Sequence, residues 1–178
     1  MTLIVICGAT ATGKSDLAVA LAEKLGGQII NADSMQLYKG MDIGTAKLSI
    51  EERKGIRHHL IDVLSVREEA SVAQYQNDAR NLIDQLLEQS IPAIVVGGTG
   101  LYIKSILDDL NFPDTDPEVR EKIARQAEEL GVDVMHERLT RLDPAAAAAI
   151  PKENVRRVVR ALEVIELTGR PYTANLPR

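Results

Sequence analysis

Near its start the chain reads Gly8-Ala9-Thr10-Ala11-Thr12-Gly13-Lys14-Ser15, a full match to the pattern G-x-x-x-x-G-K-[ST]. The match follows a run rich in β-branched residues and precedes a segment with helical spacing of leucines. Glycines let such a loop wrap so that its backbone N–H groups converge on phosphate oxygens, and the helix N-terminus adds partial positive charge. We therefore predict a phosphate-binding P-loop in which Lys14 neutralises an outer phosphate and the Ser15 hydroxyl holds Mg²⁺.

Outward from this loop, four short runs are mainly apolar, with neighbouring apolar residues instead of a strict alternation with polar ones. They span residues 3–7, 28–31, 59–64 and 93–96. Uninterrupted apolar strands are typical of parallel sheets that are covered on both faces. Helical patterns separate the runs, one marked by leucines at positions 17, 21 and 25 and a longer one extending from Val72 to Leu87. The alternation predicts an α/β fold, a P-loop NTPase-like parallel sheet flanked by helices.

A stretch rich in proline and aspartate, Asn111 to Pro117, separates this pattern from a purely helical one. We predict a P-loop α/β core over residues 1–112 and a C-terminal helical segment over residues 113–178. Helix starts are indicated by aspartates followed by first-turn prolines and by an asparagine cap, at Asp116-Pro117, Asp143-Pro144 and Asn154. Three helices are therefore expected.

The composition is that of an ordinary folded domain, with 45% hydrophobic and 26% charged residues over 178 positions. A net charge of -5 argues against a wholly nucleic-acid-binding surface, so any RNA contact must be local. Cys7 is the single cysteine and lies in an apolar run, where we expect a buried, reduced thiol. With no basic leader and no run of membrane-spanning length, we expect a cytoplasmic protein without membrane association, acting as a monomer.

The P-loop alone leaves open whether the phosphates belong to a nucleotide such as ATP or to another diphosphate. A plain ATPase should add an apolar strand that ends in a metal-binding aspartate. The run at residues 93–96 instead leads into Gly97-Gly98-Thr99-Gly100. This weakens the ATPase interpretation, whereas a small-molecule kinase stays open.

Four further segments carry a resemblance to a known family. The first is residues 31–47, NADSMQLYKGMDIGTAK, and the others are residues 58–62 (HHLID), 97–102 (GGTGLY) and 156–164 (RRVVRALEV). In this order and approximate spacing, together with the P-loop, they closely resemble the tRNA dimethylallyltransferases, also called isopentenyltransferases. The likeness runs from Leu3 to about Thr173. Members of that family continue well past residue 178, so we expect a C-terminally shortened member whose helical segment begins the helical RNA-binding insertion.

The resemblance implies transfer of a dimethylallyl group from dimethylallyl diphosphate to N6 of an adenosine adjacent to the anticodon in tRNA, with release of pyrophosphate. It implies that the P-loop holds the diphosphate with Mg²⁺, and that Asp33, Lys14 and Thr99 are catalytic. It also places a set of residues at the tRNA: Asp33, Ser34, Met35, Gln36, Thr99, Arg156, Arg157 and Arg160. Helical spacing alone would equally fit a solvated arginine face paired with Glu163.

Asp33 is the candidate base because an adenine amino group is a poor nucleophile and must lose a proton as the new bond forms. It follows the second apolar run, at the sheet edge where ligands of open α/β sheets collect. By position alone, an aspartate that caps a turn is equally compatible with the sequence. The paired histidines His58 and His59 are not interpreted as a metal site, since adjacent strand residues point to opposite faces.

Three alternatives remain at this stage. An adenylate isopentenyltransferase would share the P-loop and the base but prenylate free AMP, ADP or ATP. A small-molecule P-loop kinase would transfer phosphate from ATP. A non-catalytic fragment would bind dimethylallyl diphosphate with Mg²⁺ and turn nothing over.

Overall fold

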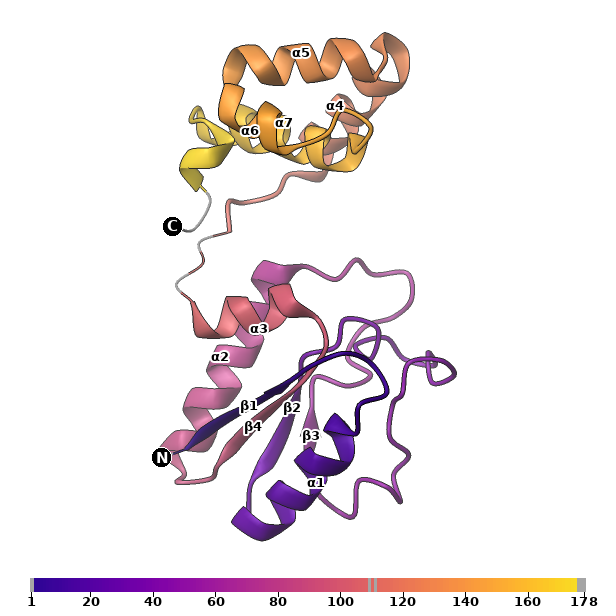
Figure 1. Ribbon diagram of the computed structural model, residues 1–178, viewed down its shortest axis with the longest axis vertical. Coiled ribbons are helices and arrows are strands. Elements are labelled where there is room, and N and C mark those ends of the chain that lie inside the picture. The colour runs from indigo at the N-terminus through magenta and orange to yellow at the C-terminus, as the bar shows by residue number, and fades with distance from the viewer. Residues whose placement is uncertain (1, 109, 111, 176–178) are drawn as a thin grey trace. The chain divides into compact units, whose positions relative to one another are not determined.

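The computed structural model describes residues 2–108, 110 and 112–175 (Figure 1). The chain divides into two compact units, Met1–Asp109 and Leu110–Arg178, where the sequence suggested a division between residues 112 and 113. The proline-rich residues that follow the division therefore belong to the second unit.

The first unit is built on a four-stranded, wholly parallel sheet in the order β1-β4-β2-β3. Its strands are β1 (Leu3–Cys7), β2 (Gln28–Asn31), β3 (His58–His59) and β4 (Ala93–Gly97). Its helices are α1 (Lys14–Leu25), α2 (Val72–Glu88) and α3 (Gly100–Leu107). The predicted fold class, a parallel sheet flanked by helices, is confirmed, and Figure 1 shows α1 on one face of the sheet with α2 and α3 on the other.

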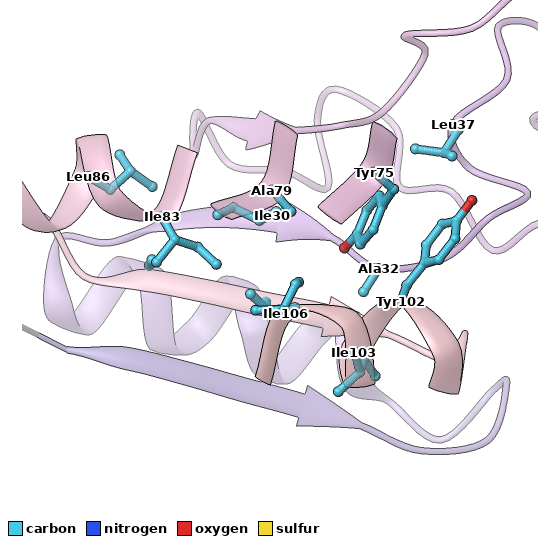
Figure 2. Packing of buried hydrophobic residues seen from close by; sticks show 12 residues of the cluster. Ile30, Ala32, Leu37, Tyr75, Ala79, Ile83, Leu86, Tyr102, Ile103 and Ile106 are labelled. Carbon is cyan, nitrogen blue, oxygen red and sulfur yellow. The ribbon is translucent and has the colours of Figure 1, made fainter. Parts of the chain in front are cut away.

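Alternating side chains of the central strands build one core on each face of the sheet. Ile30 and Val95 pack against α2 and α3, whereas their neighbours Ile29 and Ile94 pack against α1. In Figure 2 the rings of Tyr75 and Tyr102 lie face to face in the first of these cores, with centroids 3.9 Å apart and planes inclined by 12°. Both faces of β2 and β4 are therefore covered, which explains why these strands are apolar without alternation.

Two expectations for this unit were wrong, one for a strand and one for Cys7. The run at residues 59–64 contributes only His59 to β3, because the chain turns out of the sheet where Leu60 and Asp62 both adopt φ of 57°. The helix marked by leucines is confirmed as α1, which buries Ala18, Val19 and Ala22; Leu21 packs partly against them, and Leu17 and Leu25 are exposed. Leucines four residues apart advance by about 400° per step and so drift around a helix. Cys7, expected to be buried, is exposed at the end of an edge strand.

The second unit is helical, with α4 (Pro117–Leu130), α5 (Val132–Leu142), α6 (Pro144–Ala149), α7 (Val155–Thr168) and a 3₁₀ turn, η1 (Tyr172–Asn175). The predicted caps are confirmed, since Asp116, Asp143 and Asn154 each accept a hydrogen bond from a first-turn N–H. Four α-helices are present instead of three, because Gly131, with φ of 85° and ψ of 159°, ends α4 and begins α5. No helix in the described part of the chain is long and apolar enough to span a bilayer.

Candidate active site

A cavity of about 210 Å³ opens in the first unit. It is lined by the P-loop and the start of α1, by the ends of β2 and β4, and by the segment that precedes β3: Thr10, Ala11, Thr12, Gly13, Lys14, Ser15, Asp16, Asn31, Asp33, Gln36, Ala46, Leu48, Val96 and Gly97. Parallel strands place their carboxyl ends along one sheet edge, which is where such folds bind ligands. The structure thus brings most of the P-loop together with Asp33 and Gln36, two of the residues singled out from the sequence.

The P-loop is shaped by two residues in the left-handed region, Ala11 with φ of 62° and Gly13 with φ of 77°. Gly13 is the N-cap of α1 and has no side chain to occupy the first N–H groups of the helix. Lys14 Nζ donates to the carbonyl of Ala9 and approaches Thr12 Oγ1 at 3.5 Å, so its ammonium group lies over the loop. Backbone amides, a helix N-terminus and an ammonium group therefore surround one anion-sized space.

Asp33 lies across the cavity from the loop, two residues beyond β2. Its Oδ1 accepts the Met35 N–H at 2.9 Å. Among the described residues Oδ2 accepts no hydrogen bond, so this oxygen is the one left for a ligand. One carboxylate oxygen is committed to local structure and the other is free for chemistry.

Thr99 does not line the cavity, but it fixes the turn that carries Asp33. Its Oγ1 accepts the Ser34 N–H at 3.0 Å and lies 3.4 Å from Ser34 Oγ, while its own N–H donates to Ala32 O at 3.1 Å. Ser34 and Met35 also fall outside the lining residues. Thr99 therefore holds the backbone on both sides of Asp33, at Ala32 and at Ser34.

Gln36 is oriented by the loop that follows it. Its Nε2 donates to Thr45 O at 2.9 Å, which fixes the sense of the amide and leaves Oε1 and one N–H for a ligand. Lys47 closes this loop with ion pairs of 2.7 Å to both Asp42 and Asp62, and its side chain is 3% exposed. Burial alone would lower the pKa of Lys47, but the two carboxylates outweigh burial and raise the pKa above its usual range.

Gly97 allows β4 to approach β2 at the base of the cavity. A Cβ at this position would lie 2.2 Å from the carbonyl carbon and oxygen of Ala32, the residue before Asp33. A side chain at position 97 would collide with the backbone of Ala32, so glycine is required where the two strands lie this close.

The predicted arginines lie on α7 in the helical unit. Arg156 and Arg157 are exposed. Arg160 instead donates to Pro113 O at 2.9 Å and Asp114 O at 3.3 Å, and pairs with the fully buried Glu163 at 3.0 Å. Arg160 is thus committed to contacts inside its own unit.

Glu163 is the centre of a buried polar network. Its carboxylate accepts hydrogen bonds from Thr115 Oγ1 at 2.7 Å, from the Asp116 N–H at 3.1 Å and from Arg120 Nε at 3.0 Å, besides its contact with Arg160. Burial alone would raise the pKa of Glu163, but these donors outweigh it and lower the pKa. The network ties residues 113–116 to α4 and α7.

The two histidines of β3 serve separate contacts. His58 Nδ1 donates to Ile56 O at 2.9 Å, and His59 Nε2 lies 2.7 Å from Gln28 Oε1. Burial lowers the pKa of both rings. Each histidine is therefore held neutral as part of the strand.

Comparison with known proteins identifies the family. A family model described as IPP transferase matches residues 36–178. The chain belongs to the IPP transferase family. The tRNA dimethylallyltransferase of Streptomyces griseus is 58% identical over 175 residues, which cover 98% of this chain and 56% of that protein. The enzyme of the same name from Corynebacterium glutamicum is 52% identical over 177 residues, which cover 99% of this chain and 59% of that protein.

Solved structures agree with this assignment. The tRNA isopentenylpyrophosphate transferase of Bacillus halodurans is 45% identical with a TM-score of 0.60, and the match covers 96% of this chain and 57% of that one. A eukaryotic dimethylallyltransferase acting on tRNA is 31% identical with a TM-score of 0.83, over 98% and 44% of the two chains. The family expected from the sequence is confirmed, and the chain spans about half the length of the relatives it matches.

Three residues that shape the site lie in segments quoted from the sequence but were given no role there: Asn31, Lys47 and Gly97. Asn31 follows Ile29 and Ile30 at the end of β2, and Gly97 ends the apolar strand β4, so a polar residue or a glycine at a strand end is a usable signal. Lys47 offered none, because its two partners, Asp42 and Asp62, are 5 and 15 residues away along the chain.

Proposed function

We propose that this IPP transferase chain carries the catalytic centre of an enzyme that transfers a dimethylallyl group from dimethylallyl diphosphate to N6 of an adenosine adjacent to the anticodon in tRNA. Pyrophosphate is released. The observation that carries the proposal is the shared cavity of about 210 Å³, in which the P-loop and Asp33 face the same space. The names of the matched relatives support the choice of donor and acceptor.

On the donor side, the bond between the allylic carbon and the diphosphate oxygen breaks, and negative charge accumulates on the diphosphate. Lys14, the loop amides and the N-terminus of α1 are placed to stabilise that charge. The described residues contain no group of three or more His, Cys, Asp or Glu that could hold a metal. A Mg²⁺ ion held mainly by phosphate oxygens, with the Ser15 hydroxyl as protein ligand, fits this donor set and would supply further neutralisation of the leaving group.

On the acceptor side, a bond forms between the allylic carbon and N6 of adenine, and N6 loses a proton. Asp33 Oδ2 is the proposed acceptor of that proton, because Oδ1 is held by the Met35 N–H. The Gln36 amide, fixed by Thr45, offers an acceptor and a donor to the adenine edge. An anticodon-loop base is already partly unstacked, so it enters such a cavity more easily than a duplex base.

The rest of the tRNA contact is proposed to include Ser34, Met35 and Thr99 near the target base and the α7 arginines at phosphates. Arg156 and Arg157 have exposed side chains suited to this role, whereas Arg160 is engaged with Glu163. Affinity for the stem-loop should therefore fall as salt rises, and replacing both exposed arginines should reduce the salt slope by about two.

The test is incubation of the whole protein with labelled dimethylallyl diphosphate, Mg²⁺ and an anticodon stem-loop. We expect label on the RNA, abolished by Asp33→Ala and unaffected by Asp84→Ala, which removes an exposed carboxylate from α2. Equal transfer after Asp33→Ala would contradict the role of that residue. Preferential labelling of free AMP would indicate an adenylate isopentenyltransferase, and phosphoryl transfer from ATP would indicate a kinase.

A further inference from the structure

Asn31 is a buried polar residue at the wall of the cavity. It is the last residue of β2, is 2% exposed and lines the cavity beside Asp33. Its two predecessors in the strand, Ile29 and Ile30, are fully buried and apolar. A polar side chain at this depth must be satisfied by hydrogen bonds, and its partners show what it does.

The Asn31 side-chain amide forms hydrogen bonds with the peptide groups on both sides of Asp33. Asn31 Oδ1 accepts the Asp33 N–H at 2.9 Å, and Asn31 Nδ2 donates to Asp33 O at 2.9 Å. Nδ2 also donates to Leu60 O at 2.9 Å. All three hydrogen-bonding groups of the Asn31 side chain are therefore used, and two of them bind Asp33.

These hydrogen bonds matter because they act directly on the two peptide groups of Asp33, whereas Thr99 binds its neighbours Ala32 and Ser34. The peptide groups on both sides of Asp33 are fixed by Asn31, and Oδ1 is fixed by Met35. Oδ2 is consequently directed by backbone that Asn31 holds. The third contact, to Leu60, fastens the same point to the turn where Leu60 adopts φ of 57°, a conformation that requires support from its surroundings.

We propose that Asn31 is a positioning residue that holds Asp33 in place for proton removal from the acceptor amine, an inference that rests on the proposed function. Asparagine suits the position because it combines two donors with one acceptor at the right length. Aspartate has the same shape but no donor, so it would face two carbonyl oxygens.

The experiment compares wild-type whole protein with Asn31→Ala, Asn31→Asp and the control Gln76→Ala. Gln76 is another buried amide of the first unit, which donates to Ser105 O in α3 and does not line the cavity. In Asn31→Ala we expect kcat for prenyl transfer to fall about 100-fold, the usual effect of a displacement near 1 Å at a reacting group. KM for dimethylallyl diphosphate should stay within about threefold, because the phosphate contacts come from residues 10–15, and Gln76→Ala should leave kcat unchanged.

Two further readouts separate positioning from a general loss of stability. In Asn31→Asp, which keeps the shape of the side chain but has neither donor, kcat should fall at least as far as in Asn31→Ala, because Asp33 O and Leu60 O both lose a hydrogen bond. In Asn31→Ala, hydrogen exchange of the Asp33 amide should accelerate at least about tenfold, while the Ile30 amide, inside the sheet, keeps its protection. If Asn31→Ala does not fold, Asn31→Ser, whose hydroxyl retains one hydrogen-bonding group, provides the same comparison.

The proposal is overturned if the folded Asn31 variant keeps kcat within threefold of Gln76→Ala, or if exchange of the Asp33 amide is unchanged. The exchange measurement needs no activity, so it remains decisive if wild-type protein transfers nothing. In that case the proposed function fails, and the exchange data alone decide whether Asn31 holds Asp33.

Discussion

Replacing Gly97 with alanine tests whether the close approach of the neighbouring parallel strands β4 and β2 sets the position of Asp33. The new Cβ would lie 2.2 Å from the carbonyl carbon of Ala32 and 2.8 Å from its Cα. Non-bonded carbons sit about 3.5 Å apart or more, so the two strands must separate by at least about 1.3 Å at this point. Ala32 is held there by hydrogen bonds from its N–H to Val96 O at 2.7 Å and from the Thr99 N–H to its own oxygen at 3.1 Å.

The magnitude follows from these contacts. Overpacking of a tight core typically destabilises by about 1–3 kcal/mol, and the obstacle here is backbone, which cannot rotate away. Losing one or both of the Ala32 hydrogen bonds adds about 1 kcal/mol each. We expect Gly97→Ala to lower the free energy of unfolding by about 2–5 kcal/mol, which corresponds to a fall in melting temperature of roughly 4–20 °C for a chain of this size.

The assay is urea and thermal unfolding followed by far-UV circular dichroism, with Gly100→Ala as the matched control. Gly100 is the first residue of α3, and a Cβ there meets nothing within 4 Å. Alanine should be neutral or stabilising at that position, by up to about 1 kcal/mol. If the free energies of unfolding of the two variants differ by less than about 1 kcal/mol, β4 does not approach Ala32 as closely as described, and Gly97 does not set the position of Asp33.

Three titrating groups give further predictions. Lys47→Met should destabilise by about 1–2 kcal/mol at pH 7, since Asp42 and Asp62 keep partial solvation. Because the pKa of Lys47 is raised, its contribution is complete below 10.5 and is lost as pH rises through the folded-state pKa, so the wild-type and Lys47→Met urea midpoints should converge at alkaline pH. Glu163→Gln should destabilise the helical unit by about 3 kcal/mol at pH 7. The pKa of Glu163 is lowered, so its contribution is present above 4.5 and lost as pH falls through the folded-state pKa, and chemical denaturation at pH 7 and pH 3 should show the difference shrinking. His58 is held neutral with a lowered pKa, so wild-type stability should fall as pH drops below 6.5, and calorimetry of His58→Gln should show a shallower fall.

Exposed residues of matching type serve as controls for these predictions. Lys104→Met removes a side chain that is 58% exposed and 4.0 Å from Asp108, and Glu128→Gln changes an exposed carboxylate of α4. Both should leave stability within about 0.5 kcal/mol of wild type. A Lys47 or Glu163 variant as mild as its control would show that burial of the charge contributes nothing measurable.

The sequence predicted the features of this molecule that depend on neighbours along the chain. The P-loop, the strands around Ile29 and Val95 and the caps at Asp116 and Asp143 are each specified by a few consecutive residues. Local patterns such as these carry their own structural meaning wherever they occur. The fold class was therefore predictable from the sequence, and phosphate binding by the loop that lines the cavity stays a prediction.

Features that depend on tertiary register could not be read in the same way. That Gly97 must be glycine follows only from the distance between β4 and Ala32. The spacing of Arg160 fitted both a substrate contact and a structural one, and only its hydrogen bonds to Pro113 and Asp114 show which residues it holds. The shortness of β3 follows from the left-handed turn at Leu60, a conformation that residue type does not predict.

The order of the strands explains the distance between the P-loop and Asp33. The P-loop follows β1 and Asp33 follows β2, and β4 lies between those strands. Two strand spacings amount to about 9–10 Å, which in the proposed reaction would leave room for a phosphate-bearing allylic group on one side and an amine on the other. The strand between them must then end without a side chain that would fill the gap, and β4 ends in Gly97, which lines the cavity. Gly97 is therefore required for two reasons: its lack of a side chain lets β4 lie close to Ala32 and leaves the cavity open. For both reasons we expect a methyl group at this position to have a large effect on stability and on the site.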